Sequence, residues 1–80
     1  MKIVEYVAVF KELNGQFYVF FPDLPKIEVY GKTLIISKER AFSCLKEFVL
    51  NSGILPMTTS INELEELYPN DVVSLIQVRV

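Results

Sequence analysis

The sequence has no histidine, no tryptophan and only one cysteine among its 80 residues. Histidine is the side chain that most often serves as a general base near neutral pH, so the usual acid–base catalyst is missing. Cys44 has no histidine to activate it as a nucleophile and no second cysteine for an internal disulfide. We therefore expect no catalytic residues, no metal and no cofactor, and hence a protein that is not an enzyme.

Basic residues form no run or stripe. The eight lysines and arginines are scattered and the formal net charge is −2, whereas nucleic-acid-binding surfaces concentrate positive charge. The glycines Gly15, Gly31 and Gly53 are too widely spaced for a phosphate-binding loop. We therefore expect no direct binding of nucleic acid by these residues, and the slight acidity favours a basic protein as partner.

Long apolar runs are also missing. No stretch approaches the length of a membrane span, and Lys2 and Glu5 interrupt the apolar first ten residues, unlike a signal peptide. Together with the lone cysteine, this pattern predicts a cytoplasmic protein.

Apolar residues nevertheless make up 51% of the chain. Its 80 residues are the length of one domain, so we expect a single domain over residues 1–80. A chain this short buries only about 60% of its unfolded surface, which makes it marginal as a monomer. The apolar surface left over predicts self-association into a homodimer or a larger oligomer.

Alternating apolar residues predict three strands in the first part of the chain, over residues 3–11, 16–21 and 26–31. Both faces of the first strand are largely apolar, which favours a central strand covered on each side. Neither face of the second strand is polar, so one of them belongs either to the core or to an interface. Asn14-Gly15 predicts a tight hairpin turn between these two strands, because such turns need positive φ.

A helical period of apolar residues predicts a long helix over residues 34–51. Thr33 and Ser37 are competing N-caps, which leaves the first residue of the helix open. Gly53 is expected in the left-handed position that commonly follows the last turn of a helix.

The rest of the chain adds a short helix and a last strand. Ser60 and Glu63 form a capping-box pattern that opens a helix through about Leu67, and residues 72–80 alternate as a strand. The element order is β-β-β-α-(α)-β. It predicts an α+β fold in which a small, mainly antiparallel sheet carries its helices on one face.

The most distinctive segment is the aromatic run 17–21, which leads directly into Pro22-Asp23-Leu24-Pro25. Each proline fixes its own φ and pushes the preceding residue towards extended geometry. The segment is therefore predicted to form a stiff, exposed corner between two strands, with the carboxylate of Asp23 at its tip. The same physics also describes an ordinary sheet corner, in which Asp23 only caps the turn.

This segment and its surroundings resemble the HicB antitoxin family. The shared pattern is Tyr-x-Ala-x-Phe, a glycine turn, aromatic-Val-x-Phe-Pro-Asp-Leu-Pro, and Gly-x-Thr-Leu before a long helix. It is carried here by Tyr6, Ala8, Phe10, Gly15, Tyr18, Val19, Phe21, Pro22, Asp23, Leu24, Pro25, Gly31, Thr33 and Leu34, followed by Ala41, Leu45, Gly53 and Pro56. The chain departs from the pattern at Lys26, where a glycine is usual, and at Ile35-Ile36-Ser37, where Glu-Glu-Ala is usual. Many members also continue into a small DNA-binding domain, whereas this sequence ends at Val80.

The resemblance implies a partial ribonuclease-H-like fold, with the last strand parallel to the first. It also implies a partner, a small basic ribonuclease of the HicA toxin type, whose RNA-binding surface and catalytic histidine the antitoxin covers. Glu5 and Asp71 are the only carboxylates near the position of a ribonuclease H metal site, and we predict an edge or salt-bridge role for Glu5 and a turn role for Asp71.

Five residues are candidates for contact with the partner, because they combine aromatic anchors with carboxylates near a rigid corner. They are Tyr18, Phe20, Asp23, Leu24 and Glu28. In the opposing interpretation, Tyr18 and Phe20 pack under the long helix and Asp23 only caps its turn. The alternative function is a solitary HicB-like module that has no cognate toxin and binds itself or another protein.

Overall fold

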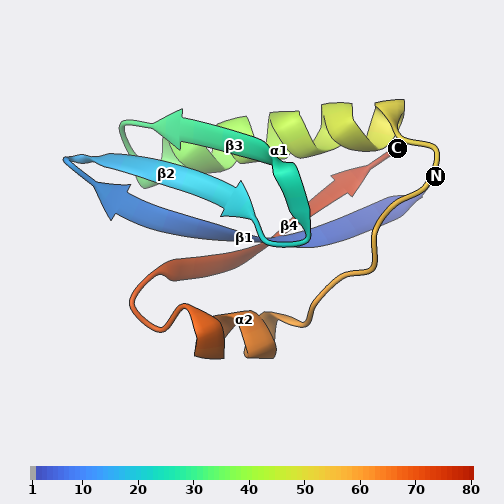
Figure 1. Cartoon of the computed structure of the whole chain (residues 1–80). Coiled ribbons are helices and arrows are strands. Elements are labelled where there is room, and N and C mark those ends of the chain that lie inside the picture. The colour runs from blue at the N-terminus through green and yellow to red at the C-terminus, as the bar shows by residue number, and fades with distance from the viewer. Residues whose placement is uncertain (1) are drawn as a thin grey trace.

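The computed structural model describes residues 2–80 as a four-stranded antiparallel sheet with two helices (Figure 1). The elements in chain order are β1 Ile3–Leu13, β2 Gln16–Phe21, β3 Leu24–Gly31, α1 Leu34–Asn51, α2 Ile61–Leu67 and β4 Val72–Arg79. The strands lie side by side in the order β3-β2-β1-β4. The predicted α+β class and the predicted order of elements are confirmed. No helix within residues 2–80 is long and apolar enough to cross a membrane.

Two short turns connect the first three strands. Asn14 and Gly15 have φ of 51° and 78°, and they close the predicted hairpin between β1 and β2, in which Leu13 pairs with Gln16. Pro22 and Asp23 form the second turn, since Phe21 pairs directly with Leu24. The proline-bounded corner of the sequence is therefore a two-residue hairpin turn between β2 and β3.

The cap of Thr33 decides where α1 begins. Its Oγ1 accepts a hydrogen bond from the backbone N–H of Ile36 at 3.1 Å, so the helix begins at Leu34 and the earlier of the two predicted caps is confirmed. Ser37 is fully buried instead, and its hydroxyl donates to the carbonyl of Leu34 at 2.8 Å. The prediction for Gly53 is wrong, because α1 ends through an extended Ser52 and Gly15 is the only glycine with positive φ among residues 2–80.

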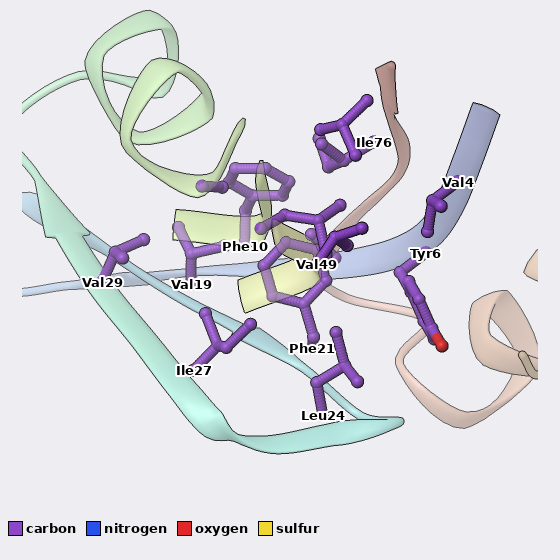
Figure 2. Close-up of a cluster of buried hydrophobic side chains, with 14 residues drawn as sticks. Val4, Tyr6, Phe10, Val19, Phe21, Leu24, Ile27, Val29, Val49 and Ile76 are labelled. Carbon is purple, nitrogen blue, oxygen red and sulfur yellow. The ribbon is translucent and has the colours of Figure 1, made fainter. Parts of the chain in front are cut away.

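The main core lies between α1 and one face of the sheet (Figure 2). The helix contributes a buried stripe of Ala41, Leu45 and Val49. Strands β1 and β2 contribute large side chains such as Tyr6, Phe10, Val19 and Phe21. Because alternate residues of a strand point to opposite faces, this arrangement leaves the intervening residues of β1 and β2 to the other face.

That other face carries α2, so the prediction that both helices share one face is not met. Figure 1 shows α1 and α2 on opposite sides of the sheet. Val7 and Val9 of β1 and Leu64 of α2 are all buried without belonging to the α1 core. The expectation that the first strand is central and covered on each side is confirmed, because α1 covers one face of β1 and α2 covers the other.

The last strand runs antiparallel to the first, which corrects the parallel arrangement implied by the family resemblance. Ile3 pairs with Arg79 and Phe10 with Val72. The 18-residue helix α1 carries the chain along one side of the sheet, and residues 52–71 carry it back along the other (Figure 1). These two passes return the chain to the end of β1, so β4 can only run in the opposite direction.

Candidate functional site

A row of aromatic rings lies on the side of β2 and β3 that points away from α1. It consists of Tyr18, Phe20, Tyr30 and Tyr68, and we call it the aromatic face. The ring centroids of Tyr18 lie 5.2 Å from Tyr30 and 5.6 Å from Phe20, and Phe20 meets Tyr68 edge-on at 5.5 Å. These spacings are those of aromatic pairs in favourable contact.

The pairing of β2 with β3 builds this row. Tyr18 lies directly opposite Tyr30, and Phe20 lies opposite Glu28. The alternating residues Val19 and Phe21 point into the α1 core instead. Tyr68 comes from the segment just after α2, so the row joins residues far apart in the sequence.

One carboxylate borders the aromatic face on its open side. Glu28 is exposed, and the side chain of Tyr30 keeps 54% of its surface accessible. Burial raises the pKa of Tyr18, and the neighbouring Glu28 carboxylate and Tyr30 raise it further. The Tyr18 phenol therefore stays protonated at neutral pH and remains a hydrogen-bond donor.

A lysine borders the opposite end of the same row. The Nζ of Lys11 lies 5.5 Å from the centroid of the Tyr68 ring, within the range of a cation–π contact. It also lies 3.0 Å from an Oδ atom of Asp71. The ring of Tyr68 thus contacts both Phe20 and the cation of an ion pair. Tyr18, Phe20 and Tyr68 are half-buried, whereas Tyr30 and Glu28 are the exposed members at the other end of the face.

The predicted corner has a different environment. Asp23 is half-buried, and its two carboxylate oxygens accept hydrogen bonds of 2.7 Å from the backbone N–H and the hydroxyl of Thr59. The hydroxyl of Tyr6 donates to the carbonyl of Pro56 nearby. Burial, and then the Asp23 carboxylate, raise the pKa of Tyr6. The bonds from Thr59 thus tie this segment to the β2–β3 turn, and the bond from Tyr6 ties Pro56 to β1.

The structure brings together three of the five predicted partner-binding residues, Tyr18, Phe20 and Glu28. They face away from α1, contrary to the interpretation that places the two aromatic residues under the long helix. Leu24 is 2% exposed and belongs to the α1 core (Figure 2). Asp23 sits at the turn as predicted, but it is bound to Thr59 and is not a free tip.

Sequence reasoning did not name Tyr30, Tyr68 or Thr59. Tyr30 could have been found, because it shares a face with Glu28 two residues earlier and pairs with Tyr18 across the hairpin. Tyr68 and Thr59 could not, since each reaches its partner through a long-range approach of the chain that no local pattern encodes.

The two carboxylates considered for a metal site are engaged elsewhere. Glu5 accepts a hydrogen bond from the side-chain amide of Gln77 at 3.3 Å, and Asp71 pairs with Lys11. Within residues 2–80 there is no group of three or more histidine, cysteine, aspartate or glutamate side chains that could hold a metal ion.

No family sequence model matches the chain, and neither does any curated protein. Among solved structures, it is similar to the crystal structure of the N-terminal domain of the antitoxin HicB from Burkholderia pseudomallei. The two share 19% identity with a TM-score of 0.70 over 96% of this chain and 100% of that domain. The crystal structure of HicB from the same organism matches with a TM-score of 0.71 and 19% identity, over 94% of this chain and 62% of that one. The resemblance read from the sequence is thus confirmed at the level of the fold, which is that of the HicB N-terminal domain.

Proposed function

We propose that this chain is an antitoxin domain of the HicB type, which binds a small basic toxin ribonuclease of the HicA type and masks its active surface in the cytoplasm. The observation that carries the proposal is the likeness to the HicB N-terminal domain, which extends over 96% of this chain. The motif residues shared with the family lie along the same length of sequence, so fold and sequence pattern favour the same assignment.

The aromatic face is the surface that we assign to the toxin. Tyrosine side chains give an interface large contact areas with a polar tip, and few of their rotatable bonds have to be immobilised. Tyr18 and Tyr30 are already held against each other at 5.2 Å, so little ordering cost remains on binding. Glu28 adds a negative charge beside them, which suits a basic partner.

The experiment starts from the gene neighbourhood. A toxin candidate is a short basic protein encoded in the adjacent reading frame with a single histidine in a glycine-rich context. Co-expression of the 80-residue chain should rescue growth from that toxin, and calorimetric titration of a catalytically inactive toxin should give a specific complex. Failure of both would refute the proposal.

Variants of the aromatic face locate the contact. Tyr30→Ala should weaken toxin binding by about 2 kcal/mol, or about 30-fold, if Tyr30 anchors the interface. Glu28→Gln should slow association more than it speeds dissociation, because it removes a charge from the rim. Glu65→Gln, at an exposed position on α2, is the matched control and should bind like the unmodified chain.

The alternative is a solitary HicB-like module without a cognate toxin, which acts by self-assembly or through another protein. It is favoured by the departures from the family pattern, since Lys26 and Ile35 are both exposed and Ile35 keeps 71% of its surface accessible. The absence of any toxin gene beside this one, together with a stable oligomer of the isolated chain, would favour this alternative.

A further inference from the structure

The two edges of the sheet are protected to very different degrees. Edge strands expose unpaired N–H and C=O groups, and proteins block them with proline, lysine, bulges or covering elements. β3 has all of these, since it carries Pro25 and Lys26 and its pairing with β2 is irregular at Phe20 and Phe21. In addition, Arg40 of α1 donates a 2.6 Å hydrogen bond to the carbonyl of Tyr30.

β4, the other edge, has no such protection over most of its length. Residues 72–78 contain no proline, lysine or other charged side chain, and no irregularity interrupts the register with β1. Val72 and Leu75 keep 42% and 47% of their surfaces accessible. An uninterrupted, apolar edge strand of this kind is a template for pairing with another strand.

The hydrogen bonds at the end of β4 show which of its backbone groups are free. Lys2 and Val80 exchange N–H···O bonds of 2.7 and 2.8 Å. Since hydrogen-bonded and non-hydrogen-bonded positions alternate in an antiparallel ladder, the even-numbered residues of β4 bond to β1. The N–H and C=O groups of Val73, Leu75 and Gln77 therefore point outward.

We propose that β4 pairs with β4 of a second copy of this chain, antiparallel and centred on Leu75, to form a two-fold symmetric dimer with one continuous sheet. In such a two-fold pair, a residue a given number of positions before Leu75 in one copy lies opposite the residue the same number of positions after Leu75 in the other copy. Leu75 then faces Leu75, and Val73 faces Gln77. Each of these pairs exchanges two backbone hydrogen bonds.

Charge complementarity favours this register. Centring on Leu75 places Asp71 of one copy opposite Arg79 of the other, which gives an opposite-charge cross-strand pair at both ends of the interface. Asp71 already lies 3.0 Å from Lys11, so it would stand between two cations. Shifting the centre to Ile76 would set Arg79 opposite Val73 and leave Asp71 without the second cation.

The side of β4 that faces α1 also has room for a second strand. A groove of about 460 Å³ runs beside the edge, lined by Lys38, Glu39, Phe42 and Ser43 of α1 and by Leu75, Ile76 and Gln77 of β4. Phe42 keeps 42% of its surface accessible there. The paired strand would fill this groove with its own apolar side chains and bury Phe42. This inference does not depend on toxin binding, because it involves only copies of this chain.

Sedimentation velocity of the 80-residue chain at micromolar concentration is the first test, and we expect a dimer. Leu75→Lys places two ammonium groups opposite each other on the two-fold axis and should raise the dimer dissociation constant by about tenfold or more. Its far-UV circular dichroism should stay unchanged, because the altered side chain is on an open edge. Leu50→Lys is the matched control. It changes an apolar residue that is 63% exposed on α1 and should leave the dimer intact.

Cross-linking tests the register independently of any loss of binding. In a Cys44→Ser background, Leu75→Cys should form an intermolecular disulfide under mild oxidation. The Cα atoms of such a pair lie about 5.5 Å apart, within the range that a disulfide spans. Gln77→Cys should not, because the two copies of residue 77 would lie about 14 Å apart along the strand direction. A monomeric chain, a dimer insensitive to Leu75→Lys, or equal cross-linking at both positions would overturn the proposal.

Discussion

The hydrogen bonds between Asp23 and Thr59 predict a measurable stability effect. Both carboxylate oxygens accept bonds of 2.7 Å, and hydrogen bonds to charged groups contribute about 1.5–3 kcal/mol. Asp23→Ala removes both and leaves the Thr59 N–H without its acceptor. Because the site is only half-buried, we expect a loss of about 2 kcal/mol, in the lower part of that range. For a domain of this size, that corresponds to a fall in Tm of about 8–16 °C.

Two milder changes separate the components of this contact. Asp23→Asn keeps one carbonyl oxygen but cannot accept both bonds, so about half of the loss is expected, or about 1 kcal/mol. Thr59→Val removes only the hydroxyl donor and should cost a similar amount. Thermal unfolding followed by circular dichroism measures all three variants. Glu65→Gln on α2 serves as the control.

The same variants distinguish anchoring from toxin contact. If Asp23 holds residues 56–59 in place, stability falls first and toxin affinity follows only indirectly. If Asp23 instead meets a basic residue of the toxin, Asp23→Asn keeps its Tm and weakens binding by about 1.5–3 kcal/mol. A variant with unchanged stability would refute the anchoring role, and a variant unchanged in both measurements would leave Asp23 as an ordinary turn residue.

Two further predictions follow from close packing and from tyrosine ionisation. A Cβ on Gly31 would lie 2.7 Å from the backbone nitrogen of Ser37, so Gly31→Ala should force α1 away from β3 and cost about 1–3 kcal/mol in urea unfolding. Gly53→Ala meets nothing within 4 Å and should be close to neutral; equal effects of the two changes would contradict this. Burial, followed by Asp23, raises the pKa of Tyr6 above 10.0, so folding favours the protonated phenol. The free energy of unfolding should then be fully retained below pH 10 and fall as pH rises through the folded pKa. Tyr6→Phe should make this fall shallower and lose about 1 kcal/mol at neutral pH, because the hydrogen bond to Pro56 is absent; an unchanged alkaline profile would count against the assignment.

Local patterns in the sequence predicted most elements because their causes are local. The cap of Thr33, the Asn14-Gly15 turn and the alternation of β2 each act within a few residues, and each appears in the structure as expected. The left-handed Gly53 failed because Ser52 ends α1 in an extended conformation, which is also a permitted way to leave a helix. Capping motifs are common preferences and do not by themselves decide the exit.

Arrangements that depend on distant segments were predicted less well. The direction of β4 depends on how many times the chain runs along the sheet between β3 and β4. Local sequence patterns do not encode that number, so they could not predict the direction. The position of α2 had a usable signal, since Val7 and Val9 made the second face of β1 apolar and something had to cover it. For the candidate site, alternation places Tyr18, Phe20 and Glu28 on one face correctly, whereas the links of Asp23 to Thr59 and of Phe20 to Tyr68 required the folded chain.

The aromatic face and the β4 edge belong to different parts of the molecule, which predicts that toxin binding and dimerisation are separable. Tyr18, Phe20 and Tyr30 of the aromatic face lie on β2 and β3, and β1 separates these strands from β4. A two-fold axis perpendicular to the continuous sheet would place both aromatic faces on the same side, so that one dimer could bind two toxin molecules. Leu75→Lys should therefore weaken the dimer about tenfold or more and keep toxin affinity per chain within about twofold, since an effect below about 0.4 kcal/mol is expected for a distant site. Tyr30→Ala should do the reverse, with weakened toxin binding and an intact dimer. Calorimetric stoichiometry and sedimentation on the two variants decide the matter, and a loss of both properties in either variant would show that the two surfaces are coupled.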